Sequence, residues 1–318
     1  MTTPAPSPVA QAALPATLPA LAGDTLGALV ESGARLLQAA GVSFGHGTTN
    51  AHDEAAWLVL WCLGLALDTP LNANAPDSQQ NMPLTPAQQA QAATLFEQRI
   101  STRKPAAYLT REAWLQGVRF YVDERAIVPR SLIAELIAEG GFDDFLDENT
   151  RRVLDLCTGN GSLAVLAAMA WPEVQVTGAD ISTDALAVAR INIDQHGLQE
   201  RITLQTSDGM ADVPGPWDLI ICNPPYVNSQ SMAALPAEYL AEPTLALAGG
   251  SDGMDFIRRL LQTAPMHMTE HAVLVLEIGN ERDFFEAAFP QLPAFWLDTS
   301  AGGDQVVLLT RAALQRLI

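Results

Sequence analysis

The chain has 318 residues, of which 48% are hydrophobic and 17% charged, and its formal net charge at pH 7 is −19. This composition supplies a core for one large domain or two smaller ones and predicts a globular cytoplasmic protein, because no apolar run reaches the length of a bilayer span. The negative charge repels phosphate backbones and no basic patch offsets it, so we expect no direct nucleic-acid specificity and no membrane partner.

The N-terminal third divides into a tail and a helical region. Residues 1–22 are rich in proline and alanine and carry no charge, which predicts a disordered tail. Across residues 23–110, apolar side chains recur three and four positions apart, the spacing of helices that bury one face. Thr85, Pro86 and Gln88 follow the order of a helix N-cap, a first-turn proline and a capping box. We therefore expect a small helical domain.

The pattern changes after this domain. Aromatic and branched residues flank Gln116 and the glycine after it, so residues 111–125 are predicted to form a β-hairpin linker. In residues 126–318, strand-like runs alternate with helical stretches, which indicates a parallel sheet with helices on its faces. Two last strand-like runs follow one another without a helix, which predicts an antiparallel strand at the end of the sheet. The expected fold class is α/β and Rossmann-like.

A glycine-rich turn joins the first strand of this region to a helix, in "VLDLCTGNGSLAVLAA". Gly159 and Gly161 allow the backbone to approach a ligand, and the helix start offers unpaired N–H groups. Asp180 ends the next strand, where a carboxylate can accept both hydroxyls of a ribose. These features fit a nicotinamide dinucleotide and S-adenosylmethionine equally well.

Asp155, inside the first strand of this region, favours S-adenosylmethionine. A carboxylate there would repel a pyrophosphate, whereas it suits the cationic amino and sulfonium end of S-adenosylmethionine. The alternative is that Asp155 caps the N–H groups of its own turn. Asp208, in the turn after the third strand, can accept from an adenine amino group, or it is an ordinary turn aspartate.

The segment "DLIICNPPYV" ends the fourth strand with Asn223, two prolines and Tyr226. The prolines leave an extended stretch with carbonyl acceptors and no N–H donors. The Asn223 side-chain carbonyl and the Pro224 backbone carbonyl can hold both N–H groups of a planar amide or aromatic amine, and Tyr226 can cover it with its ring. Such a clamp aims the nitrogen lone pair at a methyl donor. The alternative is a strand-ending turn with a packed tyrosine.

Together, "DLCTGNG", "GADIS", "SDGM" and "NPPY" resemble the Asn-Pro-Pro-Tyr branch of class I S-adenosylmethionine methyltransferases. The segments on either side resemble the protein glutamine N(5)-methyltransferase family, and most of all its members that act on large-subunit ribosomal protein three. The resemblance implies a seven-stranded sheet, S-adenosylmethionine as the methyl donor and a glutamine side-chain amide as the acceptor. It assigns the acceptor amide to Asn223, Pro224 and Tyr226. It places the cofactor at Asp155, Thr158, Gly159, Asn160, Gly161, Asp180, Asp208 and Asn223.

The same resemblance implies that the helical domain recognises the protein substrate, free or on an assembly intermediate of the ribosome. Glutamine methylation of release factors and adenine methylation in nucleic acid remain alternatives, as do a dehydrogenase and a non-catalytic assembly module. Cys157 stands where many relatives have glycine, and Gly209 stands where the release-factor members often have an aromatic residue near adenine. No metal site is expected, because His267 and His271 have no third ligand nearby in the sequence.

Overall fold

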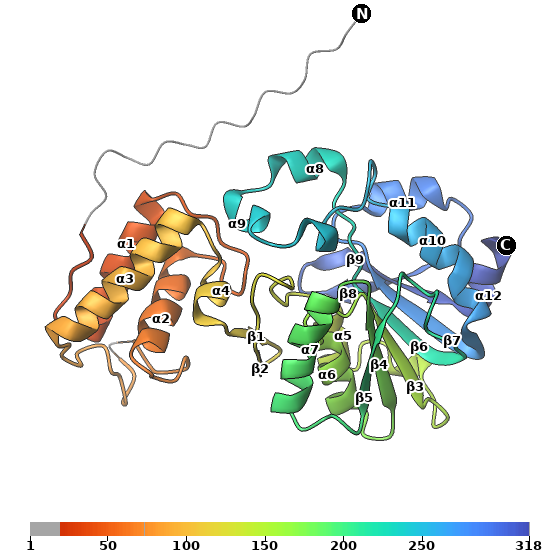
Figure 1. Cartoon of the computed structure of the whole chain (residues 1–318), viewed down its shortest axis with the longest axis horizontal. Coiled ribbons are helices and arrows are strands. Elements are labelled where there is room, and N and C mark those ends of the chain that lie inside the picture. Colours follow the sequence, from red (N-terminus) through yellow and green to blue (C-terminus); the bar gives the residue numbers. More distant parts are fainter. Residues whose placement is uncertain (1–19, 73, 318) are drawn as a thin grey trace, which may run out of the picture. The chain divides into compact units, whose positions relative to one another are not determined.

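The computed structural model describes residues 20–72 and 74–317, which separate into two units. The first unit runs to Thr110 and also takes in Ala234–Ala241, and the second comprises Arg111–Ala233 and Glu242–Ile318. The first unit is helical and the second contains a sheet flanked by helices (Figure 1). All but the last three positions of the predicted tail lie outside the described residues.

The first unit is built from helices, as its apolar spacing predicts. Thr85 caps the longest of them, accepting from the Gln88 backbone N–H at 3.3 Å, while the Gln88 side chain accepts from the Thr85 N–H at 2.9 Å. The predicted capping box is therefore confirmed. The helices of this unit are α1 (Leu26–Ala39), α2 (Ala51–Cys62), α3 (Pro86–Thr102), α4 (Ala106–Thr110) and α9 (Ala237–Leu240).

A fully buried arginine joins three parts of this unit. Arg99 of α3 donates to Glu54 of α2 at 2.7 Å and to Glu238 of α9 at 3.1 Å. The Nη2 group of Arg99 donates to the Ser43 carbonyl at 2.9 Å. A planar guanidinium satisfies several acceptors in one geometry, so Arg99 holds α9, which comes from far along the chain, within the helical core.

The second unit starts with the predicted hairpin, made of β1 (Ala113–Leu115) and β2 (Val118–Phe120). Gln116 and Gly117 connect the two strands with φ angles of 49° and 72°. Positive φ at both central positions is the geometry of a two-residue turn whose twist matches its strands. The turn residues seen in the sequence thus correctly indicated where the chain reverses.

Seven strands form the sheet of the second unit, in the order β5-β4-β3-β6-β7-β9-β8. Neighbours from β5 to β7 pair in parallel, while β9 pairs antiparallel with both β7 and β8. The prediction of a mostly parallel Rossmann-like sheet with an antiparallel strand from the chain end is confirmed. The strands are β3 (Arg152–Leu156), β4 (Gln175–Asp180), β5 (Ile202–Thr206), β6 (Trp217–Cys222), β7 (Met268–Glu277), β8 (Phe295–Thr299) and β9 (Gly302–Thr310).

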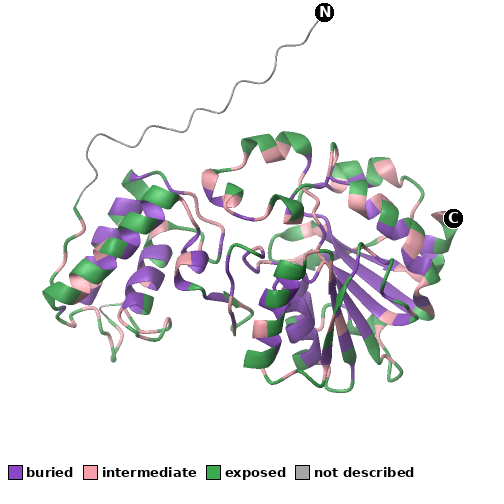
Figure 2. Ribbon diagram, in the orientation of Figure 1, coloured by how far each residue is buried: buried purple, intermediate pink, exposed green. Residues whose placement is uncertain are grey.

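Helices cover both faces of this sheet, and Figure 2 shows its strands as largely buried. One face packs against α5 (Ile133–Glu139), α6 (Ser162–Ala170) and α7 (Thr183–Gln195). The other packs against α10 (Asp255–Thr263), α11 (Arg282–Ala288) and α12 (Arg311–Leu314). Shorter elements complete the unit: α8 (Ser229–Ala234), η1 (Asp143–Phe145), η2 (Thr244–Ala246), η3 (Ala264–Met266) and η4 (Gln315–Leu317).

The two-residue period of a strand decides which face each side chain joins. In β3, Val153 joins the core on the α6 side, whereas Leu154 and Leu156 join the core on the α10 side. Asp155 lies between these two leucines in sequence, so its side chain projects to the α6 side. This parity determines what Asp155 contacts.

Candidate active site

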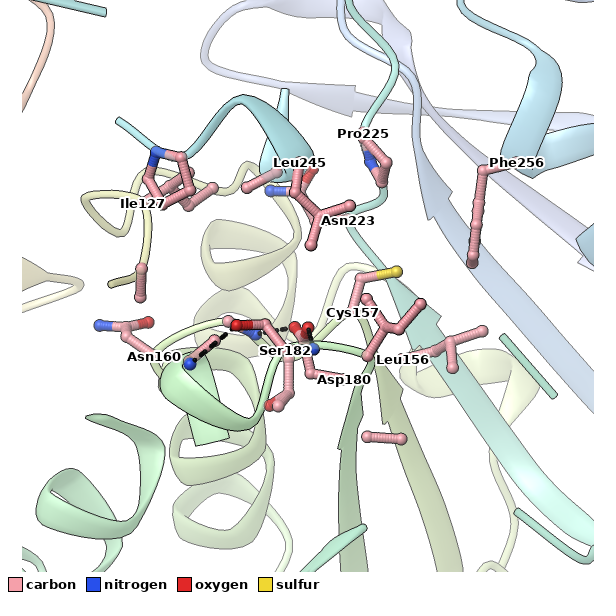
Figure 3. Close-up of a pocket in the computed structure, with 18 of the residues that line it drawn as sticks. Ile127, Leu156, Cys157, Asn160, Asp180, Ser182, Asn223, Pro225, Leu245 and Phe256 are labelled. Atoms are coloured by element: carbon pink, nitrogen blue, oxygen red, sulfur yellow. Dashed lines mark hydrogen bonds between the residues drawn. The ribbon is translucent and has the colours of Figure 1, made fainter. Parts of the chain in front are cut away.

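A cavity of about 370 Å³ lies at the carboxyl ends of the central strands (Figure 3). Ligands of open α/β sheets bind at this edge, next to the point where the strand order reverses. Here β3 lies between β4 and β6, and Leu156 is registered with Cys222. The lining comes from the loops after four strands, and it includes residues 156–160, 179–182, 207–209, 223 and 225.

The loop after β3 needs residues that accept a left-handed backbone. Gly159 and Gly161 have φ angles of 54° and 80°, and a Cβ on Gly161 would lie 3.0 Å from the Cβ of Ala189. Cys157 also has a positive φ, of 60°, which costs a residue with a side chain more than it costs glycine. The frequent glycine at this position in the resembled family has a physical reason in this backbone.

Asp155 is fully buried and holds the loop after β3 in place through hydrogen bonds. Its Oδ2 accepts from the Thr158 hydroxyl and, at 2.9 Å, from the Ala164 N–H in the first turn of α6. Burial raises the pKa of Asp155 to about 7, against the lowering effect of these two donors. Asp155 is absent from the described residues that line the cavity, so its contact with a cofactor stays a prediction.

Asp180 and Thr158 do line the cavity. The Asp180 carboxylate accepts from the Gly159 N–H and the Ser182 N–H, both at 2.9 Å, which fixes it at the end of β4. Burial raises the pKa of Asp180, while the N–H donors oppose that shift. Its oxygens retain lone pairs for further donors, as two ribose hydroxyls would require.

Asn160 offers an unused donor at the same cavity. Its Oδ1 accepts from the Ser162 N–H at 3.2 Å, which identifies the other amide atom as nitrogen. That Nδ2 is buried and has no hydrogen-bond partner among the described residues. Because a buried unpaired donor is costly, the arrangement fits a ligand that carries a carboxylate, as the methionine end of S-adenosylmethionine does.

Phe256 is a lining residue that the sequence did not reveal. It comes from α10, and a Cβ on Gly209 would lie 3.7 Å from its ring. An aromatic face therefore lies beside Gly209, although position 209 itself carries no ring. Arg259 stacks over Phe256 with its guanidinium 5.7 Å from the ring centre and pairs with Asp208 at 3.3 Å. Asp208 lines the cavity but is partly engaged by this arginine.

Of the Asn-Pro-Pro-Tyr segment, Asn223 and Pro225 line the cavity. In Figure 3, Asn223 lies across the cavity from Asp180. Pro224 and Tyr226 are not among the described lining residues, and the Tyr226 hydroxyl donates to Glu277 at 3.2 Å. The structure thus brings Asn223 to the glycine loop, while the assignment of Pro224 and Tyr226 to the acceptor amide stays a prediction.

A second wall of the cavity comes from residues 125–131, before β3. Glu242 holds it by accepting from the Val128 N–H at 2.9 Å and from both terminal nitrogens of Arg130 at 2.7 Å. The residues that follow Glu242 line the cavity too, among them Leu245. This pairing joins segments more than a hundred residues apart, so no local pattern signalled it.

Comparisons with known proteins support a methyltransferase site. Residues 142–271 match the family model of the methyltransferase small domain. A ribosomal protein uL3 glutamine methyltransferase of Bordetella pertussis is 50% identical over 92% of this chain and 96% of its own length. Proteins of the same name are 49% identical in Burkholderia pseudomallei, over 86% of this chain and 90% of theirs, and 47% identical in Neisseria meningitidis serogroup A, over 86% and 89%.

No helix in residues 20–72 and 74–317 has both the length and the apolar content that crossing a bilayer requires. No group of three histidine, cysteine or carboxylate side chains within those ranges is arranged to hold a metal ion. With a methyltransferase domain around the cavity and such identity over nearly the whole length of its relatives, the chain belongs to the ribosomal protein uL3 glutamine methyltransferase family.

Proposed function

We propose that this enzyme transfers a methyl group from S-adenosylmethionine to the side-chain amide nitrogen of a glutamine in ribosomal protein uL3. The relatives carry that activity in their names. The observation that carries the proposal is the placement of Asn223 at the end of β6, on the same cavity as the glycine loop after β3 and as Asp180 after β4.

The cofactor would lie along the ends of β3, β4 and β5. Asp180 would accept the ribose hydroxyls, and the unpaired Asn160 Nδ2 would donate to the carboxylate. The Phe256 ring beside Gly209 would pack on adenine, which supplies the aromatic contact that position 209 lacks. Bound in this way, S-adenosylmethionine supplies an electrophilic methyl group on a sulfonium.

The chain's own residues then make the amide nitrogen a usable nucleophile. The Asn223 side-chain carbonyl and the Pro224 backbone carbonyl accept the two amide N–H groups, which keeps the nitrogen lone pair directed toward the methyl group. As the new N–C bond forms, the S–C bond breaks and S-adenosylhomocysteine is left, and the acceptors stabilise the positive charge that develops on nitrogen. The nitrogen then loses one of its two protons to water, which gives the neutral methylamide. Since the acceptors are fixed before the reaction, little reorganisation is needed.

The helical unit would recognise the protein substrate. Its buried charge network gives it a fixed shape, and the net charge of −19 favours a basic partner over a nucleic acid. The acceptor is then either free uL3 or uL3 on an assembling large subunit. Release factors and adenine in nucleic acid are the competing acceptors.

The test is methyl transfer in vitro with labelled S-adenosylmethionine. Unmethylated uL3, large-subunit assembly intermediates, release factors and adenine-containing DNA and RNA are offered separately, and the products are mapped by mass spectrometry. We expect one added methyl on one glutamine of uL3, and no label in nucleic acid. Label on release factors alone, or on adenine, would contradict the proposal.

A further inference from the structure

The Asn-Pro-Pro-Tyr segment has few backbone groups that can hold it in place. Its acceptors must stay fixed, yet Pro224 and Pro225 have no backbone N–H with which to be tied to neighbouring chain. Strand β6 ends at Cys222, so the ladder of the sheet holds the segment only from its start. Whatever fixes the other end must act on Tyr226 and the residues after it.

Tyr226 is surrounded by glycines that let other parts of the chain approach it closely. A Cβ on Gly279 would lie 2.5 Å from its ring, and a Cβ on Gly253 would lie 2.2 Å from its carbonyl oxygen. The next residue, Val227, donates to the Leu247 carbonyl and accepts from the Gly249 N–H, both at 2.9 Å. The ring and the backbone of this end are therefore packed against residues 247–253 and 279.

One buried carboxylate makes a further polar contact with this end of the segment. Glu277, the last residue of β7, accepts from the Tyr226 hydroxyl at 3.2 Å, the Ser131 hydroxyl at 2.5 Å and the Leu132 N–H at 2.9 Å. Its neighbours Val273 and Val275 face the α5 side, and the period of the strand aims Glu277 the same way, toward the start of α5. Ser131 lines the cavity, so the Glu277 side chain links the cavity wall to the Asn-Pro-Pro-Tyr segment.

From these contacts we infer that Glu277 is a positioning residue for methyl transfer: through the Tyr226 hydroxyl it fixes the far end of the Asn-Pro-Pro-Tyr segment and thereby the acceptors at Asn223 and Pro224. The inference rests on the proposed function, because it concerns the geometry of that reaction. Glu277 itself does not touch the reacting atoms. A displacement of the acceptors lowers the rate of the chemical step and leaves the cofactor contacts at Asp180 and Asn160 in place.

The kinetic test compares Tyr226→Phe, Glu277→Gln and the double variant on uL3, below the unfolding temperature of each. Tyr226→Phe removes one hydroxyl and keeps the ring, and we expect kcat to fall about tenfold, with KM and S-adenosylhomocysteine affinity within about twofold. Glu277→Gln should lower kcat at least as far. In the double variant the loss should match that of Glu277→Gln alone, because the Ser131 hydroxyl and the Leu132 N–H occupy the one oxygen of the glutamine amide, which leaves the Tyr226 hydroxyl no acceptor on this side chain.

Tyr121→Phe is the matched control. The Tyr121 hydroxyl also donates to a carboxylate, Asp123, at 2.8 Å, and it lies outside the Asn-Pro-Pro-Tyr segment. We expect its kcat to stay within about twofold of the unmodified enzyme. Losses that multiply in the Tyr226→Phe, Glu277→Gln double variant, or a kcat unchanged in both single variants, would overturn the inference.

A structural measurement keeps the inference testable if uL3 proves not to be the acceptor or if Glu277→Gln fails to fold. Hydrogen–deuterium exchange of a peptide spanning residues 222–231 reports the Val227 N–H, which is bonded in the folded segment. Tyr226→Phe should speed exchange there at least about threefold, while peptides of β3 and α6 remain unchanged. Unchanged exchange in that peptide would overturn the inference, whereas absent uL3 methylation by the unmodified enzyme would overturn only the proposed function.

Discussion

The Arg99 network of the helical unit and the Asp155 and Glu277 sites of the sheet unit bury carboxylates by different means. In the helical unit, Glu54 and Glu238 meet the buried guanidinium of Arg99. In the sheet unit, Asp155 and Glu277 are held by hydroxyl and N–H donors, with no arginine among the contacts that the described residues make with them.

This difference distinguishes carboxylates that stabilise the fold from carboxylates that can affect the reaction. An arginine between two carboxylates cancels much of their charge and fixes helices in one arrangement, whatever binds elsewhere. Burial raises the pKa values of Asp155 and Glu277, and it also raises that of Glu54 although Arg99 opposes the shift. What distinguishes Asp155 and Glu277 is that hydrogen bonds from neutral groups, and no cation among the described residues, oppose the shift. Such groups respond to charges and contacts at the neighbouring cavity. We expect mutations in the first network to change stability and those around the cavity to change rate or pH dependence.

The largest expected effect is on the helical unit. Arg99→Ala leaves Glu54 and Glu238 buried without their shared partner, and we expect a loss of about 3–5 kcal/mol in unfolding free energy, measured by urea denaturation. Affinity for S-adenosylhomocysteine, measured by calorimetry below the transition, should persist because the cavity belongs to the other unit. Arg103→Ala, whose guanidinium reaches Glu238 from a partly exposed position, should cost less. Equal losses in the two variants would contradict the assigned role of Arg99.

Asn223→Ala should lower the reaction rate and leave the stability of the fold unchanged. We expect kcat on uL3 to fall about 10²-fold, because one acceptor of the developing charge is removed, while the unfolding temperature stays within about two degrees. Steady-state kinetics and thermal unfolding measure the two quantities. A loss of stability without a loss of kcat would show that Asn223 acts in the fold and not in the reaction, which would contradict this prediction.

Asp155 should give the ligand-free protein a distinctive pH dependence. Its pKa in the fold is about 7, above its usual 3.8, so the fold favours the protonated carboxyl. The stability that it contributes is complete below about pH 4 and is lost as the pH rises to about 7. Between about pH 5 and pH 7, the unmodified protein should lose about 2 kcal/mol relative to Asp155→Asn, measured by urea denaturation at each pH. Parallel pH profiles of the two proteins would contradict this.

The smallest effect concerns the capping box of α3. Thr85→Ala removes the side-chain acceptor for the Gln88 N–H and should cost about 1 kcal/mol of unfolding free energy. Because Thr85 belongs to the helical unit, kcat should be unchanged. A rate defect without a stability defect would indicate that this helix end acts in catalysis or binding.

Local patterns predicted much of this molecule. The capping box at Thr85 and the hairpin turn at Gln116 depend on neighbouring residues only, so both could be read from the chain. The alternation of strands and helices gave the sheet class, and the placement of Asn223 at the edge of the cavity followed from a fourth strand beside the first.

What was not predicted depends on contacts between distant segments. The packing of Phe256 beside Gly209, the pairing of Glu242 with Arg130 and the inclusion of Ala234–Ala241 in the helical unit have no nearby sequence signal. For Asp155, both a ligand contact and a turn cap were considered, and the strand parity now places its carboxylate on the loop and α6.

The sequence by itself determined the elements, the class of sheet and several of the residues that line the cavity, because these depend on periodicity, turn chemistry and residue type. The tertiary structure alone decided which buried carboxylates have a cation and which have only neutral donors. The pairing depends on how side chains far apart in the chain are oriented in space. It decides whether a buried carboxylate stabilises the fold through an ion pair or can change its protonation beside the cavity.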